Sequence, residues 1–150
     1  MIIDRTQQDV DMAIQIRDNK VKQFISLTEV EKEQIERGML TINTLNRIEA
    51  KQQYLANMLS LYAYPVKIET KSNWTSTDFF DEQNHLRILQ NLFVLKEAFY
   101  VLKSSPNIPK YLFGFIELNS VEQILVDIEF LANAMSKNWA YMGEYYMGGI

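Results

Sequence analysis

Three long segments of this chain share one register at helical spacing, and no other sequence feature constrains the fold as much. Apolar residues recur three and four positions apart, which is the spacing of one face of an α-helix. The shared positions are Leu45, Ile48, Gln52, Leu55 and Leu59, then His85, Ile88, Leu92, Leu95 and Phe99, then Val121, Ile124, Ile128, Leu131 and Met135. Helices with such stripes pack against one another, so the sequence predicts an all-α bundle. An internal duplication and ordinary bundle spacing both account for the shared register.

Capping signals divide the chain into about five predicted helices. A side-chain acceptor followed three residues later by an acid or amide satisfies the first free N–H groups of a helix. The pairs are Thr6 with Asp9, Thr28 with Glu31, Thr75 with Asp78, Asp81 with Asn84, and Ser120 with Gln123. Gly38 and Pro65 are typical of helix ends. The predicted helices cover 6–26, 28–38, 41–62, 82–103 and 120–137.

Length and composition predict a single domain. A chain of 150 residues with 47% hydrophobic and 23% charged content can bury one moderate core. We predict N-terminal helices in residues 6–62, a linker with a capped aromatic turn in residues 63–81, and C-terminal helices in residues 82–137. The alternating segment 66–71 is a possible short extended element. Residues 138–150, with three glycines and four aromatic residues, predict an irregular tail that docks on a neighbour.

Charge and cysteine content restrict the partners that we expect. A net charge of -4 and a pI near 5.0 argue against nucleic acid, which attracts clustered lysine and arginine. The absence of cysteine from the sequence excludes disulfides and thiolate metal sites. The sequence also lacks an apolar run of about 18 residues, so we expect no membrane span, and its N-terminus does not resemble a secretion signal.

Residues with catalytic potential are sparse and separated in the sequence. The one histidine, His85, occupies a position of the core register, where a structural role is the better interpretation. Glu49, Asp127 and Glu129 lie on predicted helices, where carboxylates usually face water. The sequence has neither a Gly-x-Ser-x-Gly elbow nor a glycine-rich phosphate loop. We therefore predict no catalytic residue, no cofactor and no metal site.

Aromatic residues form the candidate interaction sites. Trp74, Phe79 and Phe80 lie between two capping signals, where they close one end of the bundle or form part of a surface that binds sugar or protein. The tail has less bundle to fill, so its apolar side chains are better candidates for contacts with a partner. The tail candidates are Trp139, Tyr141, Tyr145, Tyr146 and Ile150.

The segment around these aromatic residues resembles a phage protein motif. The run NWTSTDFFD, followed by Asn84-x-x-Arg87-Ile88, is similar to the pattern WT-x-x-D-x-F-N-x-x-D-x-N-R-I of structural proteins in tail and baseplate modules of phages and prophages of Gram-positive bacteria. Further similarity lies in TQQDVDMAIQIRDNKV, LTEVEKEQIERGMLTINTLNRIE and GEYYMGGI. The family pattern often places Asn before Arg-Ile, as at Asn46, whereas this chain has Leu86 before the second Arg-Ile pair.

The resemblance implies a non-enzymatic structural or adaptor component of a phage tail tip, baseplate or fibre. Such a protein would bind other tail or baseplate proteins, would occur in several copies or as a homo-oligomer, and would be located in the virion after assembly in the bacterial cytoplasm. The alternative is a module of the same apparatus that binds host cell-wall glycan through exposed aromatic rings beside polar side chains. A small helical enzyme or regulator is a third possibility, and it would require convergent titratable groups in a cleft.

Overall fold

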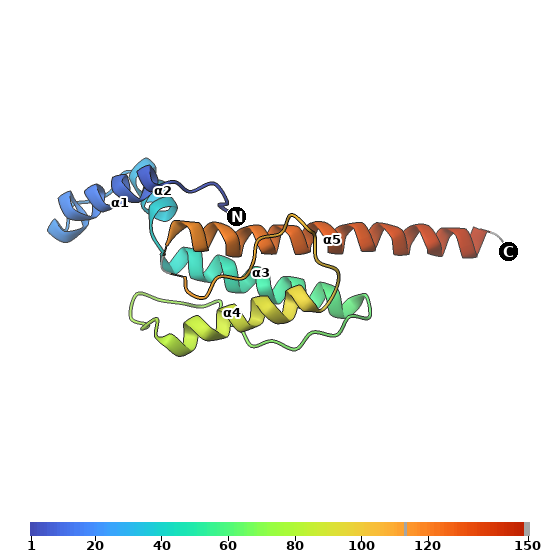
Figure 1. The fold of residues 1–150 in the computed structure, drawn as a ribbon. Helices are drawn as coiled ribbons and strands as arrows, with labels where there is room; N and C mark the ends of the chain where they lie inside the picture. The colour runs from blue at the N-terminus through green and yellow to red at the C-terminus, as the bar shows by residue number, and fades with distance from the viewer. Residues whose placement is uncertain (113, 149–150) are drawn as a thin grey trace.

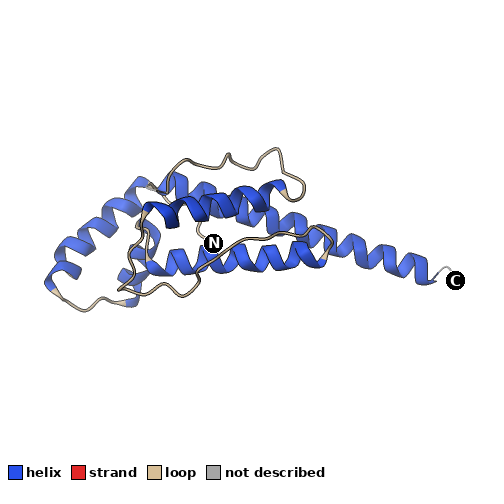
Figure 2. Cartoon of the chain, turned by 90° about the horizontal axis from the view of Figure 1, so that it is seen from below, coloured by secondary structure: helices blue, strands red, loops and turns tan. Residues whose placement is uncertain are grey.

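The structure is a computed structural model that describes the backbone of residues 1–112 and 114–148 and the side chains of this part up to residue 138. Within this part, the chain contains helices and loops but no strand (Figures 1 and 2). The elements are α1 (Gln7–Asn19), the 3₁₀ helix η1 (Val21–Gln23), α2 (Glu29–Gly38), α3 (Ile42–Leu61), α4 (Glu82–Glu97) and α5 (Phe115–Gly148). The predicted all-α bundle of about five helices is confirmed.

Helices α3, α4 and α5 pack side by side and enclose the core (Figure 1). Each presents its predicted stripe inward, because residues three and four apart lie on one helix face. Ile48, Ile88 and Ile124 are fully buried, one from each helix. Leu112 and Trp74 close the core from the connecting loops. The shared register therefore marks the faces that meet in the bundle.

Helices α1 and α2 form a hairpin that projects from one end of the bundle (Figures 1 and 2). A Cβ added to Gly38 would lie 2.2 Å from the carbonyl oxygen of Asp9 and 2.5 Å from the Cβ of Ala13. Only glycine therefore permits this close approach of the two helices. Gly38 is also the last residue of α2, as its position in the sequence predicted.

Most of the predicted caps are present. Thr6 with Asp9 and Thr28 with Glu31 form reciprocal capping boxes, and Asp81 accepts a hydrogen bond from the N–H of Asn84. Thr75 with Asp78 instead stabilises a turn: the Asp78 carboxylate accepts from the N–H of Thr75 at 2.7 Å, and no helix begins there. A local side-chain bond of this kind fits turns as well as helix starts.

Several predicted helix boundaries were wrong. Helix α1 ends at Asn19, because the chain turns through η1 and Phe24 takes a left-handed conformation with φ 57°. Helix α4 ends at Glu97, before the turn at 103–105, although the apolar sequence continues to Leu102. Helix α5 begins at Phe115, ahead of the predicted cap at Ser120, whose hydroxyl donates to the carbonyl of Ile116 inside the helix.

The two long loops run back along the helices that precede them. From α3, Ser60 accepts a hydrogen bond from the N–H of Val66, and Asn46 contacts Trp74 near the start of the helix. From α4, Lys96 donates to the carbonyl of Pro106, and His85 accepts from the N–H of Leu112. Side chains thus satisfy the backbone groups that a sheet would otherwise pair, so segment 66–71 forms no strand.

Helix α5 continues past the other helices of the bundle (Figure 1). Its assigned range reaches Gly148, beyond Lys137, where the predicted helix ended. The side chains of 139–150 lie outside the described residues. Within the described part, no helix is both long and apolar enough to span a membrane.

Candidate functional site

The three predicted clamp aromatics occupy different environments. Trp74 is 5% exposed and packs edge-on against Phe80, with ring centroids 5.7 Å apart. The Nζ atom of Lys71 lies 4.6 Å from the centre of the Trp74 ring. Phe79, by contrast, is 83% exposed. Trp74 and Phe80 therefore close the bundle, whereas Phe79 is available at the surface.

Trp74 belongs to a polar cluster on α3, which we call the Glu49 centre: Asn46, Glu49, Lys71, Trp74 and Arg87. The Asn46 amide accepts from the N–H of Trp74 at 2.7 Å and donates to its carbonyl at 3.2 Å. Glu49 is fully buried and accepts from the Trp74 indole N–H and from the N–H of Lys71. Arg87 of α4 adds two bonds to Glu49 Oε1, at 2.6 Å from Nη2 and 3.2 Å from Nε. The expectation that Glu49 faces water was wrong.

A second cluster on α5, the Glu122 centre, repeats this arrangement with Ile2, Arg5, Arg47, Asn119 and Glu122. The Asn119 amide accepts from the N–H of Arg5 at 3.0 Å and donates to its carbonyl at 2.9 Å. Glu122 is fully buried and accepts from the N–H of Ile2 and from the Arg5 guanidinium. Arg47 of α3 again contributes bonds of 2.6 Å from Nη2 and 3.2 Å from Nε to Oε1.

The two centres match residue for residue in their bonds to the backbone. In each, Asn and Glu three residues apart on a helix hold two residues, also three apart, of an antiparallel extended segment. The signal is visible in the sequence as Leu45-Asn46-x-Ile48-Glu49 and Leu118-Asn119-x-Val121-Glu122. The apolar stripes alone hide this signal, because they align Leu45 with Val121. The structural match aligns Leu45 with Leu118, three residues earlier, or nearly one helical turn.

Charges in the Glu122 centre extend to the α1–α2 hairpin. Arg47 also donates from Nη1 to Glu36 of α2 at 3.0 Å, and Glu36 accepts from the hydroxyl of Thr44 at 2.7 Å. Burial alone would lower the pKa of Arg47, but its hydrogen bonds to Glu122 and Glu36 outweigh burial and raise that pKa above its ordinary value. Arg47 therefore stays charged and joins α2, α3 and α5.

Both buried carboxylates have their acceptor sites filled by donors of the same chain. A general base or a metal ligand needs a lone pair directed at a substrate or an ion. Among the described residues, no group of three or more His, Cys, Asp or Glu is placed to hold a metal ion. These centres therefore hold extended segments on helices, which is a structural role.

His85 lies in the core, as its register position predicted. The centre of its ring lies 5.9 Å from the centre of the Phe80 ring and 6.0 Å from the centre of the Tyr111 ring. Its Nε2 atom accepts from the N–H of Leu112 at 2.9 Å. Burial lowers the pKa of His85, although the nearby charge of Glu82 opposes the shift. The neutral ring acts as the acceptor that holds the second long loop on α4.

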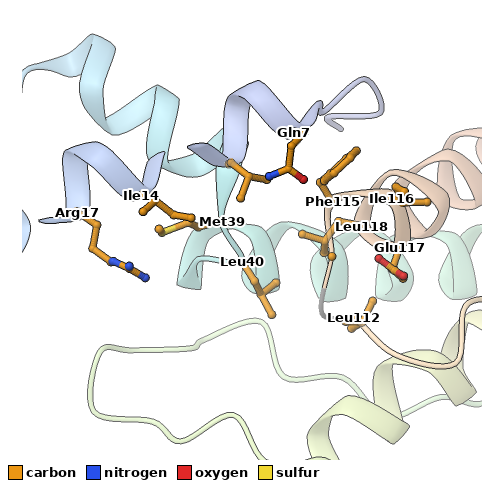
Figure 3. Close-up of a pocket in the computed structure, with 13 residues that line it drawn as sticks. Gln7, Ile14, Arg17, Met39, Leu40, Leu112, Phe115, Ile116, Glu117 and Leu118 are labelled. Atoms are coloured by element: carbon orange, nitrogen blue, oxygen red, sulfur yellow. The ribbon is translucent and has the colours of Figure 1, made fainter. Parts of the chain in front are cut away.

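A groove of about 480 Å³ lies where α1, the α2–α3 connection and the start of α5 meet (Figure 3). Ile14 and Arg17 line one side, Met39 and Leu40 the middle, and residues 115–118 the other side. The lining is mainly apolar, with charges only at Arg17 and Glu117. Such a groove suits an apolar side chain or peptide segment rather than a charged substrate.

Two adjoining hollows lie along α4, and we call them together the α4 groove. Their volumes are about 350 and 460 Å³, and they share Glu82, Leu86 and Tyr111. Leu86 is 56% exposed, and Phe93, one to two turns further along α4, is 49% exposed. Leu86 and Leu89 occupy the positions that Asn46 and Glu49 occupy on α3. On α4, therefore, leucines replace the polar residues of the two centres.

The tail candidates Trp139, Tyr141, Tyr145, Tyr146 and Ile150 have side chains that lie outside the described residues. The two other carboxylates that the sequence singled out are close to neighbours on α3 and α5. Glu129 forms an ion pair with Lys51 at 2.9 Å, and Asp127 accepts from the side chain of Gln123 at 2.8 Å.

The chain was also compared with other proteins. The search of protein-family models, of curated proteins and of solved structures gives no match to this chain.

Proposed function

We propose that this protein is a non-enzymatic structural connector of a phage or phage-like tail, at the baseplate, tail tip or fibre attachment, and that it acts through protein–protein contacts. The sequence resemblance suggests the apparatus. The observation that carries the connector role is the pair of projections from the bundle: the α1–α2 hairpin at one end and the distal part of α5 at the other (Figure 1). A rigid body with two separate projections can contact two neighbours at once.

The use of charge inside the molecule supports this proposal. Glu49 and Glu122 hold extended segments on helices, and Arg47 fixes the hairpin to the bundle. Such networks make the relative positions of the elements more rigid when their members are paired. All four carboxylate oxygens of the two centres have donors, and Arg5 Nε is the one buried atom of the centres without a partner among the described residues. A connector benefits from this rigidity because its two contact surfaces then keep a fixed separation.

The experiment that tests the proposal is the analysis of tail particles. Particles are purified from the bacterium that carries the gene, and the copy number of this protein is measured by quantitative mass spectrometry against a known tail protein. We expect a fixed ratio of several copies per particle, and we expect particles from a gene deletion to be incomplete. Normal particles without this protein would overturn the proposal.

The glycan alternative depends on exposed rings with available polar neighbours. Phe79 is exposed, but the carboxylates beside it are engaged: Asp78 binds Thr75 and Lys71, and Asp81 binds Asn84. These two carboxylates are therefore less available to sugar hydroxyls, and this favours a protein partner. A sedimentation assay with purified cell walls checks the point, with Phe79→Ala as the variant. Binding by the wild type that is lost in the variant would favour glycan recognition.

A further inference from the structure

The tip of the α1–α2 hairpin presents an aromatic side chain to solvent. Phe24 is 96% exposed, and its neighbours Val21, Ile25 and Val30 are 44%, 47% and 74% exposed. We call these four residues the hairpin tip. Phe24 has φ 57° and ψ 30°, a left-handed conformation that is strained for a residue with a Cβ. Glycine would be the favoured residue here, so the monomer fold gives no reason for a phenyl ring.

The backbone of the hairpin tip is held in place by a set of short-range hydrogen bonds. The N–H groups of Gln23 and Ile25 both donate to the carbonyl of Lys20, at 3.1 and 2.9 Å, and the N–H of Phe24 donates to Val21 at 3.1 Å. The ring is therefore presented from a fixed turn. A pre-positioned aromatic residue loses little conformational freedom on binding, which is the property of an interface anchor.

The α4 groove offers the hairpin tip a lining of matching chemistry. Its smaller hollow, about 350 Å³, is walled by Phe80, His85, Leu86 and Tyr111, so an inserted ring would meet aromatic edges and a leucine. Asp81 and Glu82, which are exposed, also line this hollow, and Lys110 lines the larger one. The hairpin tip has Lys20 and Lys22 close to Phe24, and both lysines form surface ion pairs, with Glu31 and Asp18, that water and salt can exchange.

We propose that copies of this chain bind one another head to side, with Phe24 of one copy inserted into the α4 groove of the next, and this rests on the connector role proposed above. The two surfaces are different patches of the molecule, so the contact is heterologous and each copy keeps one free tip and one free groove. Copies joined in this way form a ring or an open row. Repetition of one subunit around or along a tail needs this kind of contact.

A pair of complementary variants tests the proposal. Phe24→Gly removes the ring and relieves the left-handed strain, so it keeps the fold. Leu86→Glu places a charge in the groove at an exposed position of α4. Light scattering of the full chain over a range of concentrations should show association for the wild type and at least a tenfold weaker association for either variant alone. Phe130→Ala, at a 63% exposed position on α5, is the matched control and should associate like the wild type.

Mixing the two variants gives the decisive result. The Phe24→Gly chain keeps an intact groove, and the Leu86→Glu chain keeps an intact tip, so the mixture should form a one-to-one dimer that cannot grow further. High salt should weaken the association, because charged side chains line the groove. A mixture that remains monomeric, a wild type that is monomeric throughout, or a Phe24→Gly chain that associates normally would overturn the proposal. Circular dichroism of each variant verifies folding.

Failure of this inference and failure of the proposed function have different signatures. A chain that does not associate with itself but is found at a fixed ratio in tail particles keeps its connector role and binds other proteins. A chain that associates through Phe24 but is absent from the particles loses the tail assignment and keeps the contact.

Discussion

The Glu49 centre and the Glu122 centre have the same backbone hydrogen bonds but different charges. At Glu49, the side chain from the extended segment is the neutral indole of Trp74, and Arg87 is the cation that binds the carboxylate. At Glu122, the corresponding side chain is Arg5, whose side chain is fully buried, and Arg47 is shared with Glu36. The comparison teaches that Asn-x-x-Glu holds the extended segment in both centres. The side chain of that segment that contacts the glutamate, Trp74 or Arg5, decides how much charge must be balanced inside the protein.

Helix α4 supplies a third case in which the polar pair is absent. Leu86 and Leu89 stand where the Asn and Glu would be, and α5 has Ser120 at the position that carries Arg47 on α3. Loss of both partners of a buried pair is far less costly than loss of one. Leu89 of α4 stands at the glutamate position and Ser120 of α5 at the arginine position, and neither residue carries a charge. No charge is therefore left without its partner at this third position.

The largest expected effect is a loss of stability on substitution of a buried glutamate, and we expect it to differ between the two glutamates. Glu122→Gln leaves Arg5 buried without a charged partner, and we expect a loss of about 3–5 kcal/mol in the free energy of unfolding. Glu49→Gln keeps one acceptor oxygen, which serves either the N–H of Lys71 or the indole N–H of Trp74, and Arg87 can reach water, so we expect a loss of about 1–3 kcal/mol. Urea unfolding measures both. Equal losses would mean that the charge of Arg5 does not distinguish the centres.

The arginines give the next largest difference. Arg47→Gln removes bonds to both Glu122 and Glu36, and we expect a cost of about 2–3 kcal/mol together with looser attachment of the hairpin. Arg87→Gln affects one carboxylate, and about 1.5 kcal/mol is expected. Hydrogen exchange should show faster exchange in α1 and α2 for Arg47→Gln alone. Equal exchange in the two variants would contradict the view that Arg47 anchors the hairpin.

Substitution of each asparagine with the residue found on α4 tests whether the backbone part of the two centres is equivalent. Asn46→Leu and Asn119→Leu each remove two hydrogen bonds to an extended segment, and we expect similar losses of about 1–2 kcal/mol. Thermal unfolding measures the difference, with Asn133→Leu at an exposed position of α5 as the surface control. If one substitution costs much more than the other, the two amides do not play equivalent roles.

The smallest expected effect lies in the hairpin and depends on pH. Burial would raise the pKa of Asp9, but hydrogen bonds from Thr6, Gln34 and Arg37 lower it to about 2 from 3.8. A lowered pKa stabilises the fold above about pH 4, and this contribution is lost as the pH falls towards 2. Asp9→Asn should therefore lower the free energy of unfolding by about 1 kcal/mol at pH 6 and by little at pH 2. The value at pH 6 is discounted because Asp9 is partly exposed. Urea midpoints at both values check this, and a difference independent of pH would contradict it.

Much of the fold could be predicted, because local signals and tertiary packing agree. The reciprocal caps at Thr6 and Thr28 use atoms within three residues, and the stripe through Ile48, Ile88 and Ile124 needs only helical spacing. The end of α4 could not be predicted, since the sequence after Glu97 stays apolar and the position of the second loop decides where the helix stops. Phe24 and Val30 are exposed although both are apolar, because the hairpin projects from the bundle.

The candidate sites were harder to predict for the same reason. Glu49 is a charged residue on a helix, and such residues usually face water. Its burial depends on Arg87, Lys71 and Trp74, which approach from distant parts of the chain. The repeated Asn-x-x-Glu is visible in the sequence, but the sequence does not show which segments those side chains bind.

The sequence by itself determined the helical class, three faces of the bundle, the first caps and the end of α2 at Gly38, since these depend on neighbours within one or two turns. Only the tertiary structure decided which charges are buried, which aromatic rings are exposed and where the N-terminal residues Ile2 and Arg5 lie. Those outcomes depend on contacts between residues more than 20 positions apart, where burial makes a paired charge stable and an unpaired one costly.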